Sequence, residues 1–146
     1  MYSLGLDIGS SSIKIALVDL SGKREATVVR VPETEMTIQS PVVHWAEQDP
    51  DEWWHHSIDG INKAIQVAGI QADQIYSIGI AYQMHGLVLI DSEGKPLRPA
   101  IIWCDSRAVE SGKSIESSLD ENIIKKSLYN LPGNFTASKL KWVMDH

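Results

Sequence analysis

The sequence predicts a mixed α/β domain in which an antiparallel β-meander comes first and strands then alternate with helices. Residues 4–8 and 13–17 are two alternating apolar runs that meet at a Gly/Ser turn, a pattern typical of a β-hairpin. Residues 50–68 carry the start and stop signals of a long helix, and apolar runs alternate with helical patterns after it. Such alternation indicates a mixed sheet flanked by helices.

The turn of this first hairpin is a candidate phosphate site. Leu4, Leu6 and Ile8 alternate with small or polar residues, so Asp7 is expected on the face opposite these apolar side chains. Small residues at the turn allow successive backbone N–H groups to face outward, which suits phosphate oxygens, and a carboxylate beside them can hold a cation or its water shell. The turn residues are Gly9, Ser10, Ser11 and Ser12. The alternative is an ordinary hairpin with a solvated aspartate.

The remaining elements follow from local signals. A third strand is expected at residues 24–31, and residues 32–48 are expected to be irregular or partly extended. The long helix has Asp49 as its N-cap, Pro50 at its first position and Gly69 as its stop. Its apolar face is predicted to consist of Trp54, Ile58, Ile61, Ile65 and Ala68. Further along, the sequence predicts a buried strand at 75–82, a strand at 87–90, a turn at 91–95, an extended segment at 99–103, and helices at 106–119, 120–128 and 137–146.

Composition limits the class of protein and its partners. The 146 residues are enough for one hydrophobic core, and no apolar run approaches the roughly 20 residues that span a membrane. The formal net charge of −6 argues against nucleic acid as a partner. Cys104 is the single cysteine, so no internal disulfide can form and a cytoplasmic location is expected. The chain ends within an amphipathic pattern, which predicts that it is a fragment of a longer protein.

Two further segments carry candidate binding residues. Gln-Met-His-Gly at residues 83–86 follows a predicted strand; Gly86 lets a ligand approach the backbone, and His85 can donate or accept a hydrogen bond. The alternative is a tight turn with a satisfied histidine.

The second segment, residues 100–107, ends in Asp105 and Arg107, which can bind neighbouring hydroxyl groups. Here the alternative makes Asp105 the N-cap of the next helix and Arg107 its partner at the surface. Trp103 is expected in the core or at the wall of a cleft, and Cys104 is expected to be a buried, inert thiol.

Five segments, in this order and spacing, resemble the FGGY family of sugar kinases, and within it the xylulokinases. They are residues 6–14, 45–54, 83–86, 98–107 and 131–142. The resemblance implies two actin-like ATPase (ribonuclease H-like) domains around a cleft. Residues 1–146 would then be part of the N-terminal FGGY kinase domain, and the C-terminal domain would be absent from this chain.

The resemblance also implies a reaction and a set of roles. The parent enzyme would use ATP and Mg²⁺ to phosphorylate a ketopentose, converting D-xylulose to D-xylulose 5-phosphate. Asp7 would be the catalytic carboxylate and would hold Mg²⁺ through water. The nucleotide-binding residues would be Gly9, Ser10, Ser11, Ser12 and Lys14. The sugar-binding residues would be Met84, His85, Gly86, Asp105 and Arg107.

Some alternatives remain open. The family's general base would lie beyond residue 146, so the chain alone is expected to be inactive. Cys104-Asp-Ser106 differs from the Asn-Asp-Gly or Asn-Asp-Ala often seen in relatives, which leaves other FGGY substrates open: gluconate, ribulose or glycerol. A non-enzymatic actin- or Hsp70-like ATPase and a zinc module built from His44, His55, His56, His85 and Cys104 are less favoured. A homodimer is a further possibility that the resemblance raises.

Overall fold

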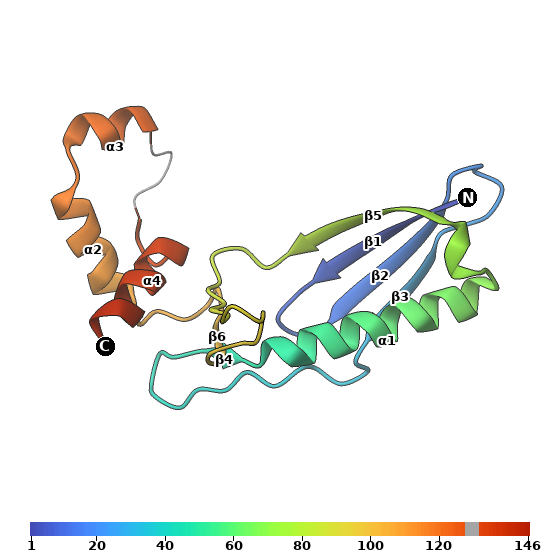
Figure 1. Ribbon diagram of the computed structural model, residues 1–146, viewed down its shortest axis with the longest axis horizontal. Coiled ribbons are helices and arrows are strands. Elements are labelled where there is room, and N and C mark those ends of the chain that lie inside the picture. The colour runs from blue at the N-terminus through green and yellow to red at the C-terminus, as the bar shows by residue number, and fades with distance from the viewer. Residues whose placement is uncertain (128–131) are drawn as a thin grey trace. The chain divides into compact units, whose positions relative to one another are not determined.

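The computed structural model describes residues 1–127 and 132–146, and these form two compact units (Figure 1). The first unit consists of Met1–Thr37 and Asp49–Gln83. The second consists of Ile38–Gln48 and Met84–His146. The chain therefore leaves the first unit after the meander, returns to it at the long helix, and leaves it again after the following strand.

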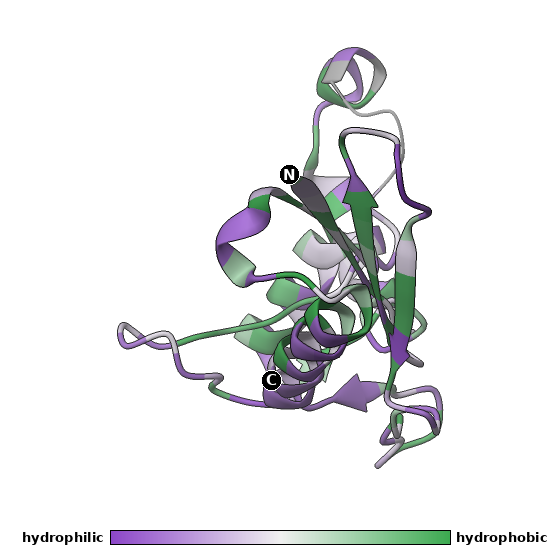
Figure 2. Cartoon of the chain, turned by 90° about the vertical axis from the view of Figure 1, so that its right-hand side faces the viewer, coloured by the Kyte–Doolittle hydropathy of each residue, from purple (hydrophilic) through white to green (hydrophobic). Residues whose placement is uncertain are grey.

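The first unit is built on a mixed four-stranded sheet in the order β3-β2-β1-β5. The strands β1 (Tyr2–Ile8), β2 (Ile13–Asp19) and β3 (Thr27–Val31) form the predicted antiparallel meander, whereas β5 (Ile75–Tyr82) runs parallel to β1. The strands are rich in apolar residues (Figure 2), and inward-facing side chains of β1 and β2 form much of the core. The predicted α/β class with a mixed sheet is confirmed, although β3 begins three residues later than predicted.

The helix α1 (Pro50–Ala68) begins and ends where its capping residues predict. The Asp49 side chain accepts a hydrogen bond from the backbone N–H of Asp51, at 3.0 Å. At the other end Gly69 adopts a left-handed conformation with φ of +64°, which a residue without a Cβ tolerates most easily. A short 3₁₀-helix, η1 (Ala72–Gln74), then leads into β5.

The predicted apolar face of α1 is wrong at two positions. Trp54 is 65% exposed and Ile58 also faces solvent, whereas Ser57, Gly60 and Ala64 are the buried residues. The reason is how closely the helix approaches the sheet, since a Cβ on Gly60 would lie 2.7 Å from Cγ1 of Ile15. Small residues therefore line the contact, and the larger apolar side chains of the helix pack beside it.

We expect Gly60→Val to lower the free energy of unfolding of the chain by about 2–3 kcal/mol, because overfilling a packed core forces side chains out of their preferred rotamers. Chemical denaturation measures this difference. Asp59→Val is the matched control, since Asp59 is an exposed residue of the same helix; its effect should stay within about 0.5 kcal/mol. Equal stability of the two variants would contradict the close approach of helix and sheet.

The prediction that residues 75–82 form a buried strand is only half correct. The strand exists, but it lies at the edge of the sheet and Ile78 and Ile80 are each 62% exposed. The helix α1 packs mainly on β2 and β3, and no helix among the described residues makes comparable contact with β5. An apolar sequence thus predicted the strand correctly, but burial also depends on what packs against it.

The second unit has little sheet and three helices within its described residues. Its strands β4 (Glu47–Gln48) and β6 (Ala100–Ile101) form a short antiparallel pair. The predicted strand at 87–90 is reduced to isolated bridges, Leu87 with Ile101 and Ile90 with Pro96, because the 91–95 turn folds the chain back at once. The helices are α2 (Val109–Ser118), α3 (Glu121–Ser127) and α4 (Thr136–Asp145). Leu128, the predicted end of the middle helix, lies outside the described residues.

Among the described residues, none of the helices combines the length and the apolar character that crossing a membrane requires.

Candidate functional site

The hairpin turn places Asp7 next to a tightly closed backbone loop in the first unit. The backbone N–H of Gly9 donates to the carbonyl oxygen of Ser12 at 3.2 Å, and the carbonyl oxygen of Ser11 accepts from the N–H of Met36 at 2.9 Å. A Cβ on Gly9 would lie only 3.0 Å from the Ser12 oxygen, so the tight closure favours glycine there. Of the predicted turn residues, Ser12 is buried and Ser11 is exposed.

Asp7 and Lys14 lie opposite each other on β1 and β2. The Nζ of Lys14 is 3.5 Å from Oδ2 of Asp7, and the Asp7 side chain is 55% exposed. This long, exposed contact leaves the carboxylate accessible to a cation. Mg²⁺ commonly binds proteins through one or two carboxylates while it keeps several waters, so Asp7 fits a hydrated Mg²⁺. Within residues 1–127 and 132–146, no group of three or more His, Cys, Asp or Glu side chains is arranged to hold a metal ion.

In the second unit, Asp105 is a completely buried carboxylate. Its Oδ2 accepts hydrogen bonds from the N–H of Ala46 at 2.6 Å and from Nε and Nη2 of Arg107 at 2.9 and 2.6 Å. Its Oδ1 accepts from the backbone N–H of Arg107 at 2.9 Å. Asp105 is not the N-cap of α2, which begins at Val109 after Ala108, and Arg107 is buried rather than a partner at the surface. The alternative in which Asp105 caps the next helix and Arg107 pairs with it at the surface is therefore wrong.

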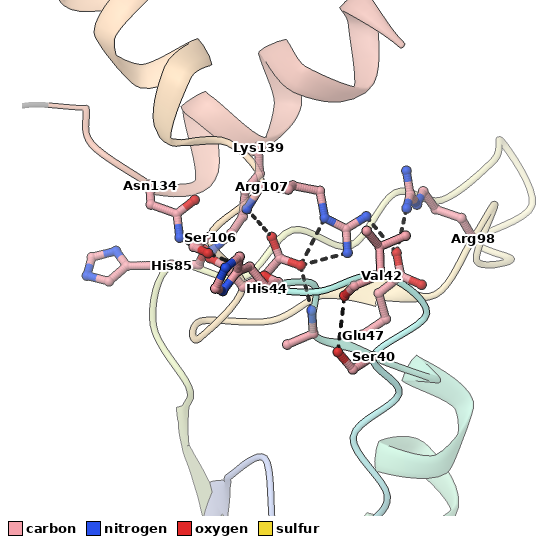
Figure 3. Close-up of polar contacts among 12 residues, drawn as sticks. Ser40, Val42, His44, Glu47, His85, Arg98, Ser106, Arg107, Asn134 and Lys139 are labelled. Atoms are coloured by element: carbon pink, nitrogen blue, oxygen red, sulfur yellow. Dashed lines mark hydrogen bonds and ion pairs between the residues drawn. The ribbon is translucent and has the colours of Figure 1, made fainter.

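Arg107 is the centre of an ion-pair network, defined here as Glu47, Arg98, Asp105 and Arg107, in which all members but the partly exposed Arg98 have buried side chains (Figure 3). Its Nη1 donates to Oε1 of Glu47 at 2.7 Å, and Nη2 of Arg98 donates to the same oxygen at 2.7 Å. The guanidinium carbon lies 3.7 Å from the ring centroid of Trp45, a cation–π contact. The sequence interpretation missed Glu47 and Arg98, although both lie within segments that carried the family resemblance.

The turn at residues 84–86 is held by the start of α4. His85 has φ of +63°, and its ring stacks on Phe135 with a centroid distance of 3.8 Å. The Lys139 ammonium donates to the carbonyl oxygen of His85 at 2.7 Å, and Oγ1 of Thr136 donates to that of Gly86 at 3.1 Å. Met84, the third predicted residue of this turn, is exposed.

Lys139 is a functional candidate that the sequence did not reveal. Its side chain is completely buried on α4, and burial lowers the pKa of the ammonium, while the nearby Asp105 carboxylate opposes that change. In the sequence it looked like any polar residue of an amphipathic helix. The only available signal was its place in the segment 131–142, which resembled the sugar kinases.

Two predictions about residues 103 and 104 are wrong. Trp103 is 53% exposed rather than in the core, and Cys104 is an exposed rather than a buried thiol. The cause is a turn that the chain makes directly after β6, where the N–H of Asp105 donates to the carbonyl oxygen of Ile102 at 3.1 Å. Both side chains lie on that turn. The other interpretation of Trp103, the wall of a cleft, stays a prediction.

The predicted site residues thus fall into two groups. Asp7, Lys14 and the turn residues 9–12 lie together on the hairpin of the first unit. The predicted sugar-side residues all belong to the second unit, where the side chain of Lys139 contacts the 84–86 turn and lies near Asp105.

Comparison with known proteins identifies a class of kinases that act on sugars or polyols. The chain is 34% identical to the xylulose kinase of Escherichia coli (strain K12), over 100% of this chain and 28% of that protein. It is also 34% identical to the glycerol kinase of Thermococcus onnurineus (strain NA1), over 99% of this chain and 29% of that protein. A xyloylose kinase from Brucella ovis has a crystal structure that superposes with a TM-score of 0.82 and 31% identity, over 100% of this chain and 30% of that one.

The sequence profile of the FGGY family of carbohydrate kinases, N-terminal domain, matches residues 2–146. The chain belongs to this family. It spans less than a third of the length of the xylulose kinase and the glycerol kinase that it matches.

Proposed function

We propose that the full-length protein containing this chain phosphorylates D-xylulose at the expense of ATP and releases D-xylulose 5-phosphate. The observation that carries the proposal is the 34% identity to a xylulose kinase over the whole chain. The chain by itself would be inactive, because the general base of the family would lie beyond residue 146. A single exposed thiol, Cys104, suits the reducing cytoplasm where we place the enzyme.

In this proposal the hairpin serves the nucleotide. Asp7 holds hydrated Mg²⁺, which when bound neutralises charge on the phosphates of ATP. The backbone of residues 9–12 and the ammonium of Lys14 contact the phosphates of ATP. Such groups suit phosphoryl transfer, because this reaction depends on the positioning of the phosphates and on the stabilisation of their charge. The exposure of the Asp7 and Lys14 side chains supports this assignment.

The second unit serves the sugar. Met84, His85 and Gly86 line the site, and Asp105 and Arg107 complete it. Three of the hydrogen bonds to Asp105 end on Oδ2 and one on Oδ1, so Oδ1 is the oxygen with capacity left for a sugar hydroxyl. Arg107 binds both Asp105 and Glu47, and these ion pairs fix the Asp105 carboxylate in place.

A second candidate is another FGGY activity, on glycerol above all. The identity to the glycerol kinase of T. onnurineus equals that to the E. coli xylulose kinase. The deciding experiment measures kcat/KM of the full-length protein with ATP and Mg²⁺ on D-xylulose, D-ribulose, gluconate and glycerol. We expect D-xylulose to be preferred by at least about tenfold, or about 1.4 kcal/mol. A preference for glycerol would replace D-xylulose as the assigned substrate. ATP hydrolysis with no phosphorylated sugar or glycerol would overturn the proposed kinase activity.

We expect His85→Ala to raise KM for the preferred sugar about tenfold, the loss of one hydrogen bond of about 1.4 kcal/mol, and to leave KM for ATP nearly unchanged. Steady-state kinetics of the full-length protein measure both constants. His55→Ala on the exposed side of α1 is the control and should change neither. A variant of His85 that altered only KM for ATP would mean that the two half-sites are assigned wrongly.

A further inference from the structure

The start of α4 and the residues before it hold both of the sugar-side segments through the backbone. Nδ2 of Asn134 donates to the carbonyl oxygen of Asp105, Oγ1 of Thr136 to that of Gly86, and Nζ of Lys139 to that of His85. We call these three donors the α4 clamp. Two segments that are separate in the sequence, 84–86 and 100–107, are thereby held by one element.

The hydrogen bond from Lys139 to His85 supports a residue whose backbone is strained. His85 has φ of +63°, a left-handed conformation that residues with a Cβ rarely adopt without support from their surroundings. The carbonyl oxygen of the same residue receives the Lys139 ammonium, and its ring stacks on Phe135 with an interplanar angle of 14°. Both contacts come from α4 or the residue before it, so the direction of the His85 ring depends on this helix.

A lysine is a costly choice for a buried helix position. Burying an ammonium is unfavourable unless it is paired and hydrogen-bonded, and an apolar side chain of similar length would fill the same space without that cost. The Lys139 side chain is completely buried, and its Nζ donates a hydrogen bond to the backbone carbonyl oxygen of His85. The charged groups that act on it come from the other sugar-side segment: Asp105 favours the charged form and Arg107 opposes it.

We propose that Lys139 is a positioning residue of the sugar site. Its ammonium fixes the left-handed backbone of His85, and so the direction in which His85 and its neighbours in the turn face the sugar, while it carries a charge complementary to Asp105. Lys139 itself does not touch the sugar. The inference rests on the proposed sugar-kinase function and adds Lys139 to the residues of the sugar site.

The test is Lys139→Met in the full-length protein, because methionine keeps the length of the side chain and removes the donor. We expect KM for the preferred sugar to rise about tenfold, KM for ATP to change less than about twofold, and kcat to fall less than the sugar KM rises. Lys141→Met is the matched control on the same helix, since Lys141 is partly exposed and pairs with Asp145; it should leave all three constants unchanged.

A second readout needs no activity. In protein labelled with ¹³C at histidine, the ring signal of His85, assigned by its loss in His85→Ala, should shift in Lys139→Met because its stacking on Phe135 changes. Lys139→Gln keeps a neutral donor and should restore part of both effects. If Lys139→Met does not fold, Lys139→Gln takes its place and must still raise the sugar KM and shift the His85 signal, although by less, because the ammonium is gone.

The outcomes separate the two proposals. A wild-type protein that phosphorylates no sugar refutes the proposed function, but the shift of the His85 signal still tests the positioning role. A folded Lys139→Met protein with an unchanged His85 signal and an unchanged sugar KM refutes the positioning role and leaves the function intact. If Lys139→Gln takes its place and leaves both the sugar KM and the His85 signal unchanged, the positioning role is refuted as well.

Discussion

Replacing Asp7 by Asn in the full-length kinase is expected to lower kcat about 100-fold, or about 2.7 kcal/mol, while KM for the sugar changes little. The reason is that Asp7 stands at the end of β1 beside the closed turn 9–12, with its carboxylate more than half exposed and paired only at 3.5 Å with Lys14. An amide of the same shape keeps the hairpin but loses the negative charge that would hold hydrated Mg²⁺. Steady-state kinetics at saturating sugar measure the effect, and a normal kcat would remove Asp7 from the mechanism.

Asp19→Asn is the matched control, because Asp19 ends the partner strand at the far end of the same hairpin. Its kcat should equal that of the wild type. Hydrogen bonds from Ser21, first from its backbone N–H and then from its hydroxyl, hold the pKa of Asp19 below its ordinary value of 3.8. A lowered pKa in the folded state contributes stability that is present above the unfolded pKa and lost as pH falls through the folded pKa. The variant should therefore be less stable than the wild type near neutral pH, and this difference should vanish on strong acidification.

The sequence predicts the first unit well, because the signals there are local. The alternation of residues 4–8 and 13–17 predicts a hairpin that forms with the expected faces, and Asp49 and Gly69 mark the two ends of α1. Each of these signals acts between residues that are near one another in the chain. A capping side chain or a pair of alternating strands needs no information about the rest of the molecule.

The errors in the predicted fold concern which surfaces of the helices and strands pack against each other. Trp54 was expected on the inner face of α1, but the inner face is lined by small residues because the helix lies so close to Ile15 and Val31. Ile78 was expected to be buried, but β5 lies at the edge of the sheet away from α1. Hydrophobic periodicity predicts an element and its faces; the distance to a partner, or the lack of one among the described residues, is a property of the tertiary structure.

The candidate site could be predicted residue by residue but not as a network. The resemblance pointed to Asp105 and Arg107, yet their partners lie far away in the sequence: Ala46 is 59 residues from Asp105, and Glu47 is 60 from Arg107. An acidic residue just before a helix and a lysine within an amphipathic one look like surface residues. Only the folded chain shows that Glu47 and Lys139 are buried beside predicted site residues.

Replacing Arg107 by Met should have the largest effect on stability, a loss of about 3–5 kcal/mol in the free energy of unfolding of the second unit. The substitution leaves the carboxylate of Asp105, which is completely buried, and that of Glu47 without their shared guanidinium. Methionine fills part of the space beside Trp45 but supplies no hydrogen bond. Breaking a buried ion pair from one side costs more than the pair contributed, because an uncompensated charge remains.

Hydrogen exchange at the backbone N–H of Ala46 is the local measurement, since this group donates to Oδ2 of Asp105 at 2.6 Å. A loss of about 3 kcal/mol accelerates its exchange more than 100-fold if exchange follows local opening. Arg98→Met is the matched control: it removes the other guanidinium on Glu47, but Arg98 is partly exposed and Glu47 keeps Arg107, so we expect a loss of about 1 kcal/mol or less. Equal exchange rates in the two variants would mean that the network does not depend on Arg107, and the geometry of Asp105 would then need another support.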